Sequence, residues 1–203
     1  MNIDFKKKNI LITGTSRGIG KELAESFFKK GANIFSTSTQ RKKTRFSKIG
    51  RNKWTHFSVD FNNDFEVKAF IRRLEKLPRI DILINNAGVN KIEDFTKIKE
   101  EDWLKINKIN LTLPYLISKT VSRKMKQQKK GHIINISSIF GVISKKKRAT
   151  YSASKSGLIG LTKAMSLDLA GSNILVNSVS PGFVKTDLIV LAGSQYGTGS
   201  SRD

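Results

Sequence analysis

A tyrosine and a lysine four residues apart, Tyr151 and Lys155, are side chains whose types and spacing directly suggest chemistry. On a helix, residues four apart lie on the same face, so the ammonium group would stand beside the phenol. A free tyrosine has a pKa near ~10 and exchanges protons poorly at neutral pH, whereas a neighbouring cation favours the phenolate and lowers that pKa. The pair could therefore exchange a proton with a reacting oxygen. Taken alone, the same spacing also occurs in chance pairs on a helix surface.

A glycine cluster near the N-terminus could hold phosphate groups. Residues 10–20 read ILITGTSRGIG, in which Gly14, Gly18 and Gly20 stand between an apolar run and an amphipathic stretch. Gly14 permits a tight turn, and the other two leave room for the backbone to approach a pyrophosphate. A helix starting near Ile19 would direct its free N–H groups at the same phosphates. The spacing Gly-x-x-x-Gly-x-Gly differs from the common dinucleotide motif, and an ordinary glycine-rich loop is the alternative.

These residues need a scaffold, and the hydrophobic pattern predicts alternating strands and helices. Strands are expected at residues 10–13, 33–38, 55–59, 80–84, 132–136 and 174–179. Helices are expected at residues 19–30, 64–77, 103–126 and 151–169, with Pro114 bending or interrupting the third. Several strands are nearly continuous in Ile, Leu and Val, as in strands covered on both faces. The alternation predicts an α/β fold with a doubly wound parallel sheet.

The length and composition of the chain indicate one globular domain. Its 203 residues suffice for a substantial core, which we assign to residues 1–191. Residues 192–203, AGSQYGTGSSRD, are rich in Gly and Ser, so we expect a disordered tail there. The absence of cysteine excludes disulfides and thiol chemistry, and we interpret the two histidines, His56 and His132, as surface or strand residues. We therefore expect no metal site.

The formal net charge of +22 at pH 7 is the unusual feature of the composition. Attraction to nucleic acid or to a membrane is one interpretation. The lysines, however, are scattered through nearly every segment, and no apolar run approaches the ~18 residues of a membrane span. No secretory signal opens the chain. We therefore interpret the charge as compositional bias and expect a cytoplasmic protein without a nucleic-acid or membrane partner; basic nucleic-acid binding stays as an alternative hypothesis.

The chain resembles the short-chain dehydrogenase/reductase family in a series of motifs that occur in the family's order. They are the glycine turn, the NNAG of Asn85–Gly88, Asn110, Ser138, the Tyr151–Lys155 pair and Pro181–Gly182. The series covers residues 9–188, and within the family the chain is most similar to 3-oxoacyl-carrier-protein reductases. The resemblance implies a Rossmann-type sheet, here with six strands. It also implies an enzyme that moves a hydride between NADP(H) and a carbonyl or alcohol, on a small molecule or an acyl thioester.

The resemblance also implies a role for each side chain of the motifs. Tyr151 would exchange a proton with the substrate oxygen, and Ser138 would hold that oxygen. Lys155 would bond the nicotinamide ribose, and Asn110 would fix a water that links Lys155 to solvent. Ser137 is the competing serine, but it would point the other way if the strand persists that far.

The segment after the second strand bears on the choice of cofactor. Residues 35–41, FSTSTQR, contain no carboxylate to bond a ribose 2′-OH, while cations and hydroxyls suit a 2′-phosphate. We therefore expect NADP(H), with NAD(H) as the alternative. By resemblance, Asp60 would bond the adenine, and Val184 and Thr186 the nicotinamide carboxamide. The full set of expected cofactor-binding residues is Gly14, Ser16, Arg17, Gly18, Ile19, Gly20, Ser38, Thr39, Arg41, Asp60, Phe61, Asn86, Ala87, Gly88, Tyr151, Lys155, Pro181, Gly182, Val184 and Thr186.

The family pattern continues after the VKTD of residues 184–187 with lid helices, a further helix and a seventh strand, whereas this chain ends at Asp203. We therefore expect a truncated protein, with its last strand as an apolar sheet edge and its substrate pocket open to water. The family implies a homodimer or homotetramer. Two hypotheses remain open: an active enzyme, and a catalytically impaired fragment that still binds nucleotide.

Overall fold

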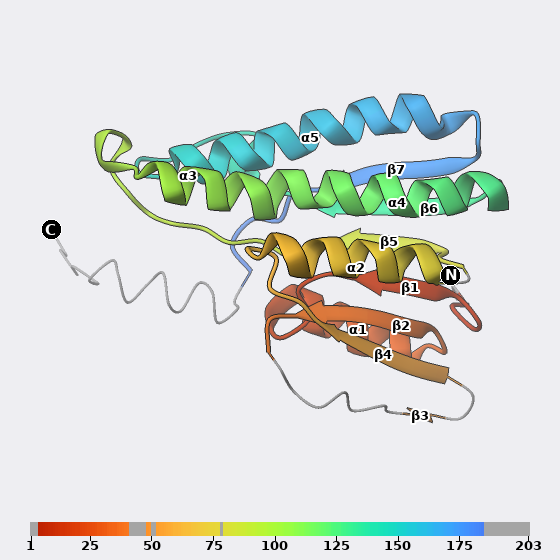
Figure 1. Cartoon of the computed structure of the whole chain (residues 1–203). Coiled ribbons are helices and arrows are strands. Elements are labelled where there is room, and N and C mark those ends of the chain that lie inside the picture. Colours follow the sequence, from red (N-terminus) through yellow and green to blue (C-terminus); the bar gives the residue numbers. More distant parts are fainter. Residues whose placement is uncertain (1–3, 41–47, 50–51, 78, 185–203) are drawn as a thin grey trace, which may run out of the picture.

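Six parallel strands form the centre of the computed structural model, which describes residues 4–40, 48–49, 52–77 and 79–184 (Figure 1). They are β1 (Asn9–Ile12), β2 (Asn33–Ser38), β4 (Asn52–Ser58), β5 (Ile82–Asn85), β6 (Gly131–Ile136) and β7 (Ile174–Val179). Their order is β4-β2-β1-β5-β6-β7, and each neighbouring pair is parallel. The predicted doubly wound α/β sheet is therefore confirmed.

The two edges of the sheet differ. At one edge lies a seventh, unpredicted strand, β3 (Lys48–Ile49), which pairs antiparallel with β4. Two residues are too short a run for hydrophobic periodicity to reveal. At the other edge of the described sheet is β7, where Leu175 and Val179 are about half exposed. The prediction of an apolar strand at this edge is confirmed for the described residues.

Helices cover both faces of the sheet (Figure 1). The helix α1 (Gly18–Lys29) packs on one face through Ala24 and Phe28, against Ile10, Ile12 and Ile34. The other face is covered by α2 (Asp64–Lys76), α4 (Leu113–Gln128) and α5 (Ala149–Ala170). Their contacts include the strand residues Leu11, Leu83, Ile133 and Val176. Strands buried on both faces explain the nearly continuous apolar runs in the sequence.

The third predicted helix is divided in the structure. It consists of α3 (Glu100–Asn107), a π-helical turn at Lys108–Thr112, and α4. Pro114, near the start of α4, has no N–H to donate to the carbonyl of Asn110 four residues earlier, so the α-helical pattern cannot continue there. The predicted interruption is thus confirmed, and it lies just before the proline. Such turns are rare and often occur at functional sites, and this one carries Asn110.

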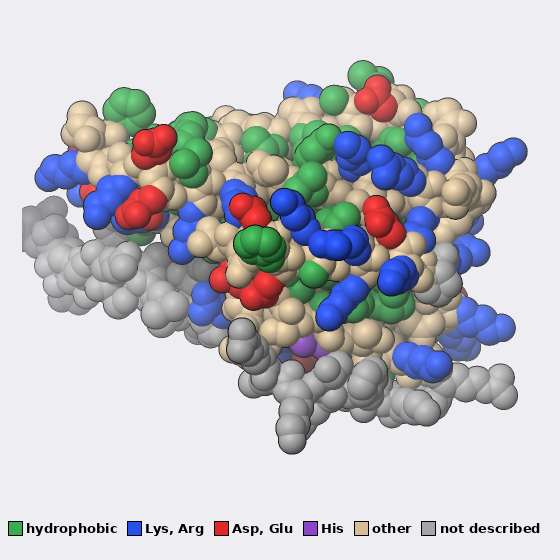
Figure 2. Space-filling view, viewed as in Figure 1, with side chains coloured by type: hydrophobic (Ala, Val, Ile, Leu, Met, Phe, Trp, Pro, Cys, Tyr) green, Lys and Arg blue, Asp and Glu red, His purple; other side chains and the backbone are tan. Residues whose placement is uncertain are grey.

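On the face seen in Figure 2, the positive charge has no single focus. Figure 2 shows Lys and Arg side chains spread over the visible face, with Asp and Glu side chains between some of them. His56 and His132 lie in β4 and β6, as the sequence predicted. Within the described ranges, none of the helices combines the length and the apolar character that a membrane crossing needs.

Candidate active site

The glycine turn between β1 and α1 leaves its backbone open. Gly14 has a φ of +70° and Gly18 one of +56°, which L side chains rarely adopt. Gly20 is buried, and a Cβ added to it would overlap the Gly14 carbonyl oxygen and the amide nitrogen of Asn86. The turn therefore requires these glycines for its shape, and their missing side chains leave the backbone accessible to a ligand.

A threonine and an asparagine lock this turn to the end of β5. The Asn86 amide donates to the carbonyls of Thr13 (2.9 Å) and Gly14 (3.0 Å). In return, the Thr13 hydroxyl accepts from the backbone N–H groups of Asn86 (3.0 Å) and Ala87 (2.9 Å). Sequence reasoning missed Thr13, because nothing in its local pattern distinguishes it from any other residue at a strand end.

The N-terminus of α1 has no cap from the protein. Arg17 is the N-cap residue, its side chain makes no capping bond, and the first turn contains no acidic residue. By contrast, Asn63 caps α2 by accepting from two backbone N–H groups. Free N–H groups and the positive end of the helix dipole form a site suited to a phosphate. Ser16 and Arg17 are both exposed beside it.

The residues predicted on the adenosine side divide into exposed and buried ones. Thr39 and Asp60 are exposed, whereas the Phe61 ring is 6 % exposed and packs in the core. The Ser38 hydroxyl is buried and is bonded to the His56 ring (3.1 Å). Arg41 lies outside the described residues. Thr39 and Asp60 are thus the predicted residues of this group whose side chains are open to a ligand.

Ser138, Tyr151 and Lys155 come together between the end of β6 and the start of α5. Ser138 is 8 % exposed and precedes a short 3-10 helix, Ile139–Gly141. Lys155 is 3 % exposed, and its Nζ donates to the carbonyl of Ile136 (2.7 Å). The same nitrogen lies 5.8 Å from the centre of the Tyr151 ring. The sequence spacing is thus realised as a hydroxyl, a phenol and an ammonium in one cluster.

The two neighbouring serines take different directions. The Ser137 hydroxyl donates to the backbone carbonyl of Lys155 (3.0 Å), and the Ser138 hydroxyl accepts from the N–H of Phe140 (3.2 Å) and interacts with Tyr151. The expectation that Ser137 points away from the tyrosine is confirmed. The bond from Ser137 to the Lys155 carbonyl connects the end of β6 with α5, and it thereby helps to hold the cluster together.

Asn110 is fully buried at the π-helical turn and is held on both sides of its amide. Its Oδ1 accepts from the Val89 N–H (2.9 Å), and its Nδ2 donates to the Val89 carbonyl (2.9 Å) and the Ser154 hydroxyl (3.0 Å). Next to Val89, a Cβ added to Gly88 would lie 3.5 Å from the Lys155 Nζ. The loop after β5 therefore connects the glycine turn with the Tyr151 cluster.

Burial shifts both titrating groups of the cluster. The pKa of Tyr151 is raised by burial, and the Ser138 hydroxyl and the Arg148 charge oppose that shift. The sequence predicted a pKa lowered by Lys155, and that direction is wrong for the described structure. The reason is that desolvation outweighs the stabilising neighbours, and that the Lys155 ammonium is directed at the Ile136 carbonyl. Burial also lowers the pKa of Lys155 to about 8.

The lowered pKa of Lys155 has a measurable effect on stability. Between pH 8 and 10.5 the folded protein binds fewer protons at this group than the unfolded chain, so the free energy of unfolding rises with pH. Relative to Lys155→Met, we expect the wild type to gain roughly 3 kcal/mol across that window. Urea unfolding at a series of pH values measures the difference. Lys119→Met, at an exposed position of α4, is the control for the loss of one positive charge.

The loop after β7 lies against the Ser138 segment. The Pro181 carbonyl accepts from the Ile139 N–H (2.9 Å), and the Phe183 ring meets the Phe140 ring edge-on with centroids 6.0 Å apart. A Cβ at Gly182 would meet nothing within 4 Å, and Val184 is 41 % exposed. Thr186 lies outside the described residues. Pro181 thus contacts the Ser138 segment, while the cofactor contacts expected of Pro181, Gly182 and Val184 stay a prediction.

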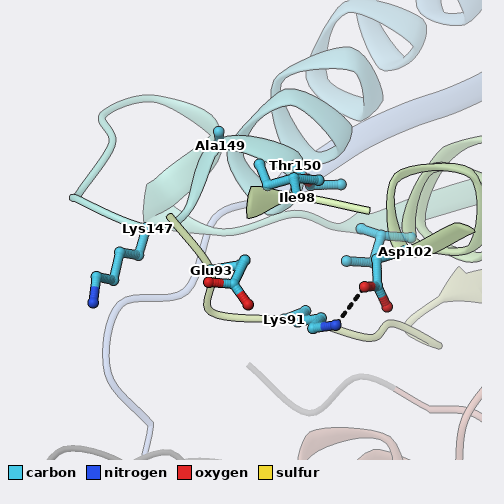
Figure 3. Close-up of a pocket in the computed structure, with 8 residues that line it drawn as sticks. Lys91, Glu93, Ile98, Asp102, Lys147, Ala149 and Thr150 are labelled. Atoms are coloured by element: carbon cyan, nitrogen blue, oxygen red, sulfur yellow. Dashed lines mark hydrogen bonds and ion pairs between the residues drawn. The ribbon is translucent and has the colours of Figure 1, made fainter. Parts of the chain in front are cut away.

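A small hollow lies beside the cluster rather than over it. Figure 3 shows Lys91 and Glu93 from the loop after β5, Asp102 from α3, and Lys147 with the start of α5 around it. Lys91 and Asp102 form an ion pair across the hollow. No group of three metal-ligating side chains occurs at residues 4–40, 48–49, 52–77 or 79–184. The hollow therefore offers neither the Tyr151 hydroxyl nor a metal centre.

Comparison with known proteins places the chain among enzymes of one kind. A family model described as short chain dehydrogenase matches residues 8–196. A 3-oxoacyl-[acyl-carrier-protein] reductase of Vibrio cholerae is 34% identical over 189 residues, which are 92% of this chain and 77% of that protein. The corresponding reductase of Aquifex aeolicus is 37% identical over 202 residues, covering 96% and 81% of the two chains.

A solved structure agrees with these sequence matches. That of 4-hydroxyisoleucine dehydrogenase complexed with NADH superimposes with a TM-score of 0.79 at 31% identity. The superposition covers 92% of this chain and 80% of the other. The similarity therefore extends over the sheet, the helices and the glycine turn alike.

Proposed function

Because this chain belongs to the short-chain dehydrogenase family, we propose that it is an oxidoreductase that transfers a hydride between NADP(H) and a carbonyl or alcohol substrate. The observation that carries the proposal is the meeting of Ser138, Tyr151 and Lys155 at one end of β6. The glycine turn lies at the same carboxyl edge of the sheet, which is where doubly wound folds bind their ligands.

The residues around the glycine turn fit a dinucleotide. The position of Gly20 has no room for a Cβ, and the first N–H groups of α1 have no side-chain cap. Ser16 and Arg17 are exposed beside those N–H groups and would contact the phosphates. The nicotinamide, when bound, supplies the hydride that adds to the substrate carbon.

We assign the proton of the reduction to Tyr151. Its raised pKa keeps the phenol protonated at neutral pH, which suits a group that must give a proton to an oxygen gaining charge. The Ser138 hydroxyl interacts with the phenol and would hold the substrate oxygen against it. In the reverse reaction the same phenol would receive the proton of the alcohol.

Lys155 and Asn110 would restore that proton from solvent. A pKa of about 8 lets Lys155 gain and lose a proton near neutral pH. Asn110 is held rigidly by Val89 and Ser154, and Pro114 leaves its carbonyl without the usual helical donor. We propose that the Asn110 backbone carbonyl binds the water that would link Lys155 to solvent.

The choice of NADP over NAD rests on charge. The end of β2 and the described residues after it contain Ser38 and Thr39 and no carboxylate, and Arg17 stands exposed at the glycine turn. A guanidinium pairs well with a phosphate and gains little from a neutral ribose hydroxyl. These residues therefore favour the cofactor that carries a 2′-phosphate.

The variant Arg17→Ala tests this choice. We expect the KM for NADPH to rise by ~10- to 100-fold, as for the loss of one charge-assisted hydrogen bond, and the KM for NADH to stay nearly unchanged. Lys21→Ala, one turn further along α1, removes an equally exposed cation and should leave both values as they are. An equal rise in the KM for NADPH and for NADH would show that Arg17 does not bind the 2′-phosphate.

Turnover of NADPH tests the activity itself. The wild type should consume NADPH with at least one member of a panel of 3-oxoacyl thioesters, ketones and quinones. If no member is turned over, while NADPH still protects the protein against thermal unfolding, the impaired nucleotide-binding protein is the correct alternative.

Gel-shift binding that survives physiological salt would instead favour the nucleic-acid hypothesis, since purely electrostatic association fades as salt rises. The cytoplasmic location and the homodimer or homotetramer stay predictions.

A further inference from the structure

Arg148 is a buried cation that the mechanism above does not use. It is 8 % exposed, and its Nε is fully buried without a hydrogen-bond acceptor. Its side chain has no ion pair or hydrogen bond to any described residue; its guanidinium lies 5.7 Å from the centre of the Phe140 ring. A buried N–H without an acceptor costs free energy, and the guanidinium has no counter-ion among the described residues.

The position of Arg148 relates it to the catalytic cluster. It is the residue directly before α5 and stands three residues before Tyr151 in the chain. Its charge acts on the Tyr151 phenol. Phe140, over which the guanidinium lies, packs against Phe183 in the loop after β7. Arg148 thus stands at one wall of the space in front of the tyrosine.

The contact with the Phe140 ring is the favourable interaction that the described residues give this cation, and it leaves the buried Nε–H without an acceptor. Arg148 is the N-cap residue of α5, yet its side chain forms no capping bond, and a positive charge at a helix N-terminus opposes the helix dipole. The chain already carries a net charge of +22, so another buried cation adds repulsion. An unpaired buried donor of this kind calls for a missing partner, and an anion would satisfy both the donor and the charge.

We infer that Arg148 binds the carboxylate of the substrate, so that the reacting carbonyl belongs to a short oxo acid. This inference rests on the proposed function, because it places the carboxylate beside a carbonyl held by Ser138 and Tyr151. The planar guanidinium binds a carboxylate through two parallel hydrogen bonds, which fixes orientation as well as charge. The Phe140 and Phe183 rings would contact the short carbon chain of the acid.

The test compares substrates that share a carbon skeleton. Acetoacetate carries the carboxylate, and its methyl ester and its N-acetylcysteamine thioester are neutral. We expect the wild type to prefer acetoacetate, and Arg148→Met to lower the acid-to-ester ratio of kcat/KM by at least ~100-fold. Arg148→Lys keeps the charge without the paired donors and should lower the ratio by about tenfold. Lys146→Met removes an exposed cation from the same loop and should leave the ratio unchanged.

A second measurement does not depend on turnover. Malonate, which cannot be reduced, should raise the melting temperature of the wild type and not that of Arg148→Met, and equimolar chloride should raise neither. Without ligand, Arg148→Met should melt higher than the wild type, because it removes an unpaired buried charge.

The possible outcomes separate the inference from the proposed function. Protection by malonate that depends on Arg148, without turnover of any carbonyl, would support the anion site and reject the enzyme. If the protein turns over both acid and ester, and Arg148→Met does not change the acid-to-ester ratio of kcat/KM, the enzyme is supported and the inference is overturned. A thioester preference that Arg148→Met abolishes would also overturn it, since Arg148 would then serve a neutral carbonyl.

Discussion

Tyr151→Phe is expected to lower kcat/KM for carbonyl reduction by about 10³-fold, the size of effect typical of a lost general acid. The substitution removes one hydroxyl from a half-buried ring of α5 and leaves the packing of that ring in place. NADPH binding should therefore persist, because Lys155 and the glycine turn are untouched. Steady-state kinetics with the best substrate of the panel, together with a fluorescence titration of NADPH, measure the two effects separately.

The chain contains a matched control for this experiment. Tyr115 and Lys119 have the same spacing on α4, with the Lys119 Nζ 5.6 Å from the Tyr115 ring centre and 3.4 Å from its hydroxyl. Tyr115 is 43 % exposed, and no serine hydroxyl is among its described partners. Tyr115→Phe should leave kcat/KM unchanged. If both variants kept full activity, or both lost it equally, Tyr151 would not be the proton donor.

Gly14→Ala should have the largest effect on the nucleotide site. A Cβ at this position would lie 2.8 Å from the Ala87 Cα and 3.1 Å from the Ala87 nitrogen, and both are backbone atoms that cannot rotate away. The φ of +70° adds strain for any residue other than glycine. We expect the free energy of unfolding to fall by about 3 kcal/mol and NADPH binding to weaken by at least ~10-fold. Urea unfolding and equilibrium titration measure these changes.

Gly160→Ala is the matched control for that substitution. Gly160 lies within α5, and a Cβ there would meet nothing within 4 Å. Alanine is the better helix former, so the free energy of unfolding should rise by about 0.5–1 kcal/mol without a change in NADPH affinity. Equal effects of the two substitutions would mean that the glycine turn has room for a side chain.

Local sequence pattern accounts for most of the scaffold. Runs such as ILI at residues 10–12 and ILIN at 82–85 are long enough in Ile and Leu to mark strands buried on both faces. The glycines at positions 14, 18 and 20 mark a turn because no other residue takes that backbone path without strain. Pro114 predicted the interruption of the third helix, because proline lacks an N–H. Each of these signals depends on residues near one another in the chain.

Contacts between distant segments were beyond such reasoning. The bonds from Asn86 to Thr13 join residues 73 apart, and the bond from Asn110 to Ser154 joins residues 44 apart. Neither is encoded in spacing, because each depends on how the strands align and how the helices pack on them. The two-residue strand β3 was missed because its pairing with β4, and not its own pattern, defines it.

The sequence by itself thus determined the fold class and the position of the glycine turn, and it predicted the residues that we propose to bind phosphate and to exchange a proton. Only the tertiary structure showed how the surroundings of Tyr151–Lys155 differ from those of Tyr115–Lys119, a pair with the same spacing and a similar distance from the lysine Nζ to the ring centre. It also reversed the expected direction of the Tyr151 pKa and left Arg148 buried without a counter-ion. The physical reason is that burial and electrostatic surroundings are created by chain segments that meet only in the folded state.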